Sequence, residues 1–294
     1  MKAILQYSLI PDEQCGFLLN KNTGECIQTL IQIYKEAKSR NCVLHTVFID
    51  FKKAFDSCSH SVLKQIFNRC KFGKFGHVLS SLLENRTIQI STAYGETDKI
   101  HLQRGVPQGD VISPLLFILF LAPLNWTLKL KHEGFPIANS KITHFSYADD
   151  LVLFSYCPLD IKALFNSVVK YCDLTGIEIN PSKCAYTINK PQYKNILKYK
   201  HQPIPLLNSN QNYKYLGLPV NLDLKWGALL SDLKNKYLNL LDIICKKFYL
   251  GSDLIIKLIN MVLIPKLAYS FQFFIARSTW HKDIAELQNK NFTP

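Results

Sequence analysis

Two adjacent carboxylates, Asp149 and Asp150, interrupt an otherwise apolar stretch from Ile142 to Ser155 that predicts two β-strands joined by a short turn. Ionised carboxylates at the end of apolar strands are costly unless a cation or hydrogen bonds compensate them, and each disfavours ionisation of the other. A bound divalent metal is the simplest compensation, because hard cations such as Mg²⁺ prefer carboxylate oxygen. The pair therefore predicts a metal site at the tip of a β-hairpin.

A third carboxylate, Asp50, ends a second strand-like run over 45–49. If the two strand regions lie side by side, three acidic groups converge on one edge of a sheet. That arrangement suits phosphoryl transfer with two metal ions. Taken alone, Asp149 and Asp150 fit a hydrogen-bonding turn equally well, and Asp50 is what favours the metal site.

The composition limits the kinds of fold and partner that this chain can have. The 294 residues are 48% hydrophobic, which is enough for a sizeable core. Lys plus Arg number 35 against 22 acidic residues, and the net charge of +13 favours a polyanionic partner, either nucleic acid or a membrane surface. The nine cysteines form no C-x-x-C pair, which predicts reduced thiols rather than a zinc site or a disulfide framework.

Targeting signals are missing from the residues given. The longest apolar run, Leu115 to Ala122, is shorter than the roughly 20 residues that cross a bilayer. The first residues do not read as a signal segment. We therefore expect an intracellular protein of the cytoplasm or nucleus that is neither secreted nor membrane-bound.

Hydrophobic periodicity predicts an α+β fold. Ser113 is expected as the N-cap of a buried helix with Pro114 at its first position. Beyond Leu222 the pattern changes to two amphipathic helices with basic faces, the second ending at Pro265. The other expected elements are helices over 23–39, 59–70 and 160–176, a hairpin within 88–102, and strands over 185–188 and 213–219.

Five segments together resemble the palm motifs of reverse transcriptases, in that family's order. Their residue patterns are most similar to those of polymerases of non-long-terminal-repeat (LINE-type) retrotransposons, and group II intron maturases are the nearest competing relatives. The resemblance extends from about Gln14 to Ala268. The five segments are 48–56, 104–117, 147–151, 176–184 and 213–217.

The resemblance implies a right-hand polymerase fold, with fingers, palm and thumb, whose antiparallel palm sheet packs on helices. Partial fingers would comprise 1–43 and 57–104, interleaved with a palm of 44–56 and 105–221. An incomplete helical thumb would follow over 222–294.

The resemblance also implies roles for the acidic residues. Asp50 and Asp149 would be the principal metal ligands, joined by the backbone carbonyl of Phe51. Asp150 would support the second metal or shape the turn. Two Mg²⁺ ions are implied, with Mn²⁺ as a possible substitute.

Other positions receive roles in the same way. Phe55 would be an aromatic gate that excludes a 2′ hydroxyl. Gln108 and Gly109 would contact the templating pair and the nucleotide. Lys183 would donate a proton to pyrophosphate, and Leu216-Gly217 would hold the primer end.

The implied function is RNA-directed DNA synthesis, with an RNA template, a DNA primer and deoxynucleoside triphosphates as partners; the resemblance assigns no oligomeric state. Two alternatives stay open: a decayed retroelement remnant that binds nucleic acid without turnover, and a different polymerase, either an RNA polymerase that copies RNA or a group II intron maturase-like enzyme. The chain departs from the family after Gly16-Phe17. There, where the family carries a triphosphate-binding arginine, stand Leu18 to Lys21, and the candidates to replace it are Lys21, Lys52 and Arg40.

Overall fold

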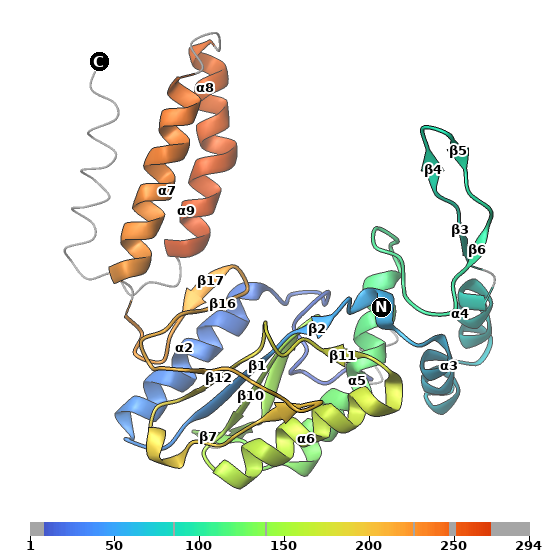
Figure 1. The fold of residues 1–294 in the computed structure, drawn as a ribbon, viewed down its shortest axis with the longest axis horizontal. Coiled ribbons are helices and arrows are strands. Elements are labelled where there is room, and N and C mark those ends of the chain that lie inside the picture. The colour runs from blue at the N-terminus through green and yellow to red at the C-terminus, as the bar shows by residue number, and fades with distance from the viewer. Residues whose placement is uncertain (1–8, 85, 139, 226, 247–250, 272–294) are drawn as a thin grey trace. The chain divides into compact units, whose positions relative to one another are not determined.

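A five-stranded sheet forms the centre of the larger part of the molecule (Figure 1). This computed structural model describes residues 9–84, 86–138, 140–225, 227–246 and 251–271. The chain divides into two compact units, residues 1–223 and 224–294. In spatial order, the strands of the sheet are β15 (Leu206–Leu207), β12 (Ala185–Ile188), β1 (His45–Ile49), β10 (Asp150–Ser155) and β9 (His144–Tyr147).

β1 is the central strand, and all five of its residues are buried. It pairs antiparallel with both β10 and β12, whereas β15 joins β12 in parallel at one edge. Side chains alternate along a strand, so Val47 and Ile49 face one side of the sheet. They belong to a continuous core with residues of α5 (Ser113–Lys131) and α6 (Pro158–Thr175).

The opposite face of the sheet carries Thr46 and Phe48. Helix α2 (Thr23–Ser39) covers it, and the Tyr34 hydroxyl of this helix lies beside the Thr46 hydroxyl. The small hairpin of β16 (Tyr213–Tyr215) and β17 (Leu218–Val220) also packs here, because the Tyr213 ring stacks on Phe48 at 4.2 Å between centroids. The predicted α+β class is confirmed, with helices on both faces of a mostly antiparallel sheet.

Helix α5 is the core helix of the first unit. By length and composition it is the one described helix that is apolar enough to cross a membrane, yet 67% of its apolar window is buried inside the protein. It begins at Ser113 with Ile112 at the N-cap position, so the expected N-cap at Ser113 is wrong by one residue.

The remaining elements of the first unit surround the sheet. Between β1 and α5 lie β2 (Phe51–Lys52), α3 (His60–Arg69), α4 (Gly73–Glu84) and the two strand pairs of one long hairpin. That hairpin comprises β3 (Thr87–Ile88) with β6 (Ile100–His101), and β4 (Ser91–Thr92) with β5 (Gly95–Glu96). The other short pairings are β7 (Phe135–Ile137) with β8 (Ser140–Ile142), β11 (Glu178–Ile179) with β2, and β13 (Lys198–Tyr199) with β14 (Gln202–Pro203).

The second unit is helical in the part that the structure describes. It contains α7 (Gly227–Cys245), α8 (Ser252–Leu258), a π-helical segment (Ile259–Leu263) and α9 (Ile264–Phe271). Pro265 lies inside α9, so the expectation that it ends the helix is wrong. A π-helical turn directly before a proline shifts the local hydrogen bonding, which lets a helix tolerate the missing N–H.

Candidate active site

The register of β1 with β10 brings the three predicted carboxylates to one end of the sheet. His45 pairs with Ser155, and the ladder ends at Ile49 opposite Leu151. One step further along the same register, Asp50 stands opposite Asp150. The structure therefore brings Asp50 together with the Asp149–Asp150 pair, at the edge that the sequence predicted.

The Ala148-Asp149 dipeptide forms the tight turn between β9 and β10. Tyr147 pairs with Asp150, which leaves only these two residues to reverse the chain. Ala148 has φ +56°, and a positive φ at the first turn residue matches the right-handed twist of the strands. The turn therefore presents Asp149 at the tip of the hairpin.

A buried glutamine, Gln14, fixes the backbone of this turn through hydrogen bonds. Its Oε1 accepts hydrogen bonds from the Ala148 N–H at 3.0 Å and the Gly16 N–H at 2.7 Å. The segment carrying it runs beside β9: the Cys15 N–H donates to the Ser146 carbonyl at 2.7 Å. Sequence reasoning assigned Gln14 no role, because its contact with Ala148 joins residues that lie 134 positions apart in the sequence.

The backbone of Asp50 is fixed by the loop that follows β11. Its carbonyl accepts a hydrogen bond from the Asn180 N–H at 2.8 Å, and its N–H donates to the Cys184 sulfur at 3.4 Å. Burial raises the pKa of the Cys184 thiol to about 11, so it remains a neutral thiol beside the carboxylate. The fourth motif of the sequence therefore supports the first through its backbone.

The carboxylates of the turn are poorly compensated. Burial, together with the negative charges of Asp149 and Asp50, raises the pKa of Asp150 to about 6. Burial and the charge of Asp50 also raise the pKa of Asp149. The site thus holds negative charges that repel one another, and a bound cation would relieve that repulsion.

The carboxylates of the site fit a hard cation that takes its remaining ligands from water and a bound substrate. Within the described ranges, no group of three His, Cys, Asp or Glu side chains stands ready to hold a metal by itself. Mg²⁺ sites, however, commonly use one or two carboxylates and complete the shell with water and substrate phosphates. Phe51, whose carbonyl was the further expected ligand, is in β2 opposite Ile179.

Phe55 lies in a stack of aromatic rings beside the acidic edge. Its ring is parallel to Phe117 at 4.6 Å and meets Phe17 edge-on at 6.2 Å. Its carbonyl accepts a hydrogen bond from the Val106 N–H at 2.9 Å, which ties the first motif to the second. Gly105 permits this contact, since a Cβ there would lie 3.0 Å from the Asp56 carbonyl oxygen.

Gln108 and Gly109 are exposed in the loop that precedes α5. The next residue, Asp110, forms an ion pair with Arg86 at the base of the β3–β6 hairpin, and this hydrogen bond lowers the pKa of Asp110. Its Oδ1 also accepts from the Ile112 N–H at 3.3 Å. This ion pair, which sequence reasoning missed, positions the loop against the hairpin.

Lys183 and the β16–β17 turn are connected through Tyr213. The Tyr213 hydroxyl donates to the Lys183 carbonyl at 3.0 Å, while the Lys183 side chain is exposed. Leu216 and Gly217 form the turn with φ values of +46° and +84°. Because Tyr213 also stacks on Phe48, this turn is anchored to β1, the strand that directly precedes Asp50.

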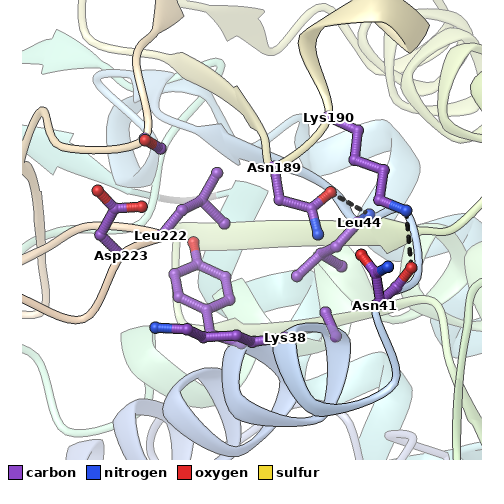
Figure 2. Close-up of a pocket in the computed structure, with 10 residues that line it drawn as sticks. Lys38, Asn41, Leu44, Asn189, Lys190, Leu222 and Asp223 are labelled. Atoms are coloured by element: carbon purple, nitrogen blue, oxygen red, sulfur yellow. Dashed lines mark hydrogen bonds between the residues drawn. The ribbon is translucent and has the colours of Figure 1, made fainter.

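A separate cavity of about 230 Å³ lies at the other end of β1 (Figure 2). Asn189 and Lys190 close one side of it through hydrogen bonds to the Leu44 N–H and the Asn41 carbonyl. Leu44, which lines this cavity, is six residues before Asp50, a distance of about 20 Å along an extended strand. None of the predicted site residues lines it.

Comparisons with known proteins bear on this site. Residues 1–220 match the reverse transcriptase (RNA-dependent DNA polymerase) family. The relatives include a Pol polyprotein from the type-1 retrotransposable element R2 of Nasonia vitripennis, 26% identical over 74% of this chain and 22% of the relative. An RNA-directed DNA polymerase from the mobile element jockey of Drosophila funebris is 22% identical over 96% of this chain and 31% of the relative. A probable RNA-directed DNA polymerase from transposon BS of Drosophila melanogaster is 29% identical over 76% of this chain and 25% of the relative.

The chain thus spans about a fifth to a third of the length of these curated relatives. Among solved structures, telomerase from Candida tropicalis, in complex with a TWJ fragment of telomeric RNA, has a TM-score of 0.53 and 16% identity. The match covers 97% of this chain and 49% of that one. At this identity the likeness shows the fold alone, and it confirms the expected right-hand polymerase architecture. The relatives confirm the resemblance to non-long-terminal-repeat elements.

Replacing Gly16 by alanine is expected to displace the acidic turn. The added Cβ would lie 2.4 Å from the Ala148 nitrogen, and such overpacking costs about 2 kcal/mol of unfolding free energy. Chemical unfolding followed by circular dichroism measures the loss. Gly227→Ala is the control, because a Cβ there meets no atom within 4 Å. Equal stability of the two variants would contradict the contact.

Replacing Asp150 by asparagine should change how stability depends on pH. The folded-state pKa of about 6 exceeds the ordinary value of 3.8, so the folded wild type binds more protons and loses stability as pH rises through that window. Asp150→Asn lacks this loss and should gain about 1–2 kcal/mol relative to wild type between pH 4 and pH 7. Urea unfolding in EDTA at both pH values is the measurement, and parallel pH profiles would refute it.

Proposed function

The chain belongs to the reverse transcriptase (RNA-dependent DNA polymerase) family, and on this premise we propose that it extends a DNA primer on an RNA template. The observation that carries the proposal is the convergence of Asp50 with the Asp149–Asp150 turn. Phosphoryl transfer requires anionic substrates to gather around a cation site. Acidic groups that repel one another at a sheet edge are suited to hold such cations.

Enzymes of this family work with divalent metal ions, and we take these to be two Mg²⁺ ions, with Mn²⁺ as a substitute. Asp50 and Asp149 would hold them with the carbonyl of Phe51, and Asp150 would support the second ion. When bound, the ions activate the primer 3′ hydroxyl and neutralise the leaving pyrophosphate. Lys183 would supply a proton to that leaving group.

The aromatic stack supports selection of deoxynucleotides. Phe55 is held between Phe17 and Phe117, so its ring has little freedom to move aside. A rigid ring beneath the sugar would collide with a 2′ hydroxyl. Gln108 and Gly109, exposed in the neighbouring loop, would contact the templating pair and the incoming nucleotide, for which glycine permits close backbone approach.

Two further parts of the fold support binding of the primer. The Leu216-Gly217 turn is anchored by Tyr213 on β1, which makes it a firm contact for the primer end. The division at residue 223 falls close to the proposed start of a thumb at 222, after fingers (1–43 and 57–104) and palm (44–56 and 105–221). The net charge of +13 suits an RNA template and a DNA primer.

An intracellular location accompanies this proposal, because its substrates are intracellular. The cysteines that the structure describes are free thiols, which suits a reducing compartment. The main alternative is a catalytically silent remnant that binds nucleic acid, for which the missing arginine after Phe17 is the argument.

Primer extension on poly(rA)/oligo(dT) with dTTP tests the proposal. Wild type should extend the primer only with Mg²⁺, and Asp149→Asn should lower the rate about 10³-fold, because it removes a charge that holds the ions. Asp173→Asn, on the exposed side of α6, is the matched control and should retain wild-type activity. A folded wild type that binds primer–template without extending it would favour the remnant.

Phe55→Ala should relax the choice of sugar. Removing the ring opens space beneath the ribose, so incorporation of UTP relative to dTTP is expected to rise about 100-fold, roughly the effect of removing a 2–3 kcal/mol clash. The ratio of kcat/KM values for the two nucleotides is the measurement. An unchanged ratio in a folded, active variant would remove Phe55 from this role.

A further inference from the structure

A second cavity opens at the turn that follows Asp50, and its walls are rich in cations. It has a volume of about 500 Å³. Its walls come from the turn after Asp50, the loop before α5 and the C-terminal end of α6. The residues that line it are Lys52, Lys53, Ser57, Arg104, Gly176 and Glu178.

The charge balance of this cavity favours an anion. Three cationic side chains face one carboxylate, Glu178. That carboxylate is already engaged by Lys200 from outside the cavity and by Lys52 at 3.5 Å, and these contacts lower its pKa. Lys53 forms no ion pair with another described residue. Positive charge therefore remains unmatched in the cavity.

Arg104 is fixed in place at the cavity wall. Its guanidinium donates to the Thr175 carbonyl at 3.3 Å and to the Gly176 carbonyl at 3.5 Å, at the C-terminal end of α6. Gly176 makes room for it, because a Cβ there would lie 2.2 Å from Nη2. A guanidinium has five N–H donors, so donors remain for an anion.

The turn that carries the two lysines is equally well defined. The Ser57 N–H donates to the Lys53 carbonyl at 2.9 Å, and the Ser57 hydroxyl donates to the Lys52 carbonyl at 3.1 Å. Lys53 adopts φ +43°, a strained conformation for a residue with a side chain. Strain of this kind persists where the surrounding structure enforces it, often at a functional site.

From this arrangement we propose that Lys52, Lys53 and Arg104 form a polyphosphate pocket, which binds the terminal phosphates of the incoming nucleotide and the pyrophosphate product. The pocket begins two residues after Asp50: Lys52 and Lys53 belong to the proposed palm, and Arg104 is the last residue of the proposed fingers, directly before the palm resumes. The pocket takes over the task of the arginine that is missing after Phe17. The inference rests on the proposed function, because it assigns this cavity to the substrate of that reaction.

Cations that are gathered in one cavity suit a compact polyphosphate. A protein that binds a nucleic-acid backbone instead places its cations along a groove. Pyrophosphate alone is therefore the first probe, by isothermal titration calorimetry. Lys53→Gln and Arg104→Gln should each weaken its binding about tenfold or more. Glu178→Gln should strengthen it, because Lys52 and Lys200 are released. Lys74→Gln, an exposed lysine of α4, is the control and should bind as wild type does.

Steady-state primer extension supplies the second readout. Lys53→Gln should raise KM for dTTP about tenfold with a smaller change in kcat, and leave the Kd for primer–template unchanged. Weaker primer–template binding with unchanged pyrophosphate binding would overturn the pocket assignment in favour of a nucleic-acid backbone. Because pyrophosphate binding needs no turnover, an inactive wild type would defeat the proposed function and leave the test of this pocket intact.

Discussion

The antiparallel pairing of β1 with β10 is the constraint on which the rest of the site depends. Both strands are buried, so a slip of one residue would turn an apolar face outward, and the register is therefore strongly specified. That register carries Asp50 to the Asp149–Asp150 turn. Apolar packing along the strands thus holds three like charges together at their ends, and burial together with their mutual repulsion raises the pKa of Asp150.

Hydrogen bonds that involve backbone groups, more than ion pairs between side chains, connect the separate motifs to this edge. The Gln14 side chain holds the Ala148 turn, the loop at Asn180 holds the carbonyl of Asp50, and the carbonyl of Phe55 receives the N–H of Val106. Each of these contacts joins segments that are distant in sequence. Such contacts fix the acidic groups without neutralising them, which preserves the charge that a metal site requires.

The sequence predicted correctly those elements whose formation depends on neighbouring residues. The helix expected over 23–39 is confirmed because Asn22 supplies a side-chain cap to the Glu25 N–H. Helix α4 was not anticipated: its buried residues are Gly76, Leu79 and Leu83, and large apolar residues on it, such as Phe75, remain exposed. The prediction that the helix ends at Pro265 was wrong because the preceding π-helical segment accommodates the proline, and no sequence pattern predicted that segment.

By itself, the sequence determined the fold class, the order of the motifs and the carboxylates that meet, because strand periodicity and turn chemistry are encoded over a few neighbouring residues. It also carried the family resemblance. Only the tertiary structure decided that Gln14 clamps the acidic turn, that Arg86 positions the loop of Gln108, and that Arg104 joins the two lysines in one cavity. These contacts bridge 24 or more residues along the chain, and their geometry depends on how the sheet, helices and loops pack together.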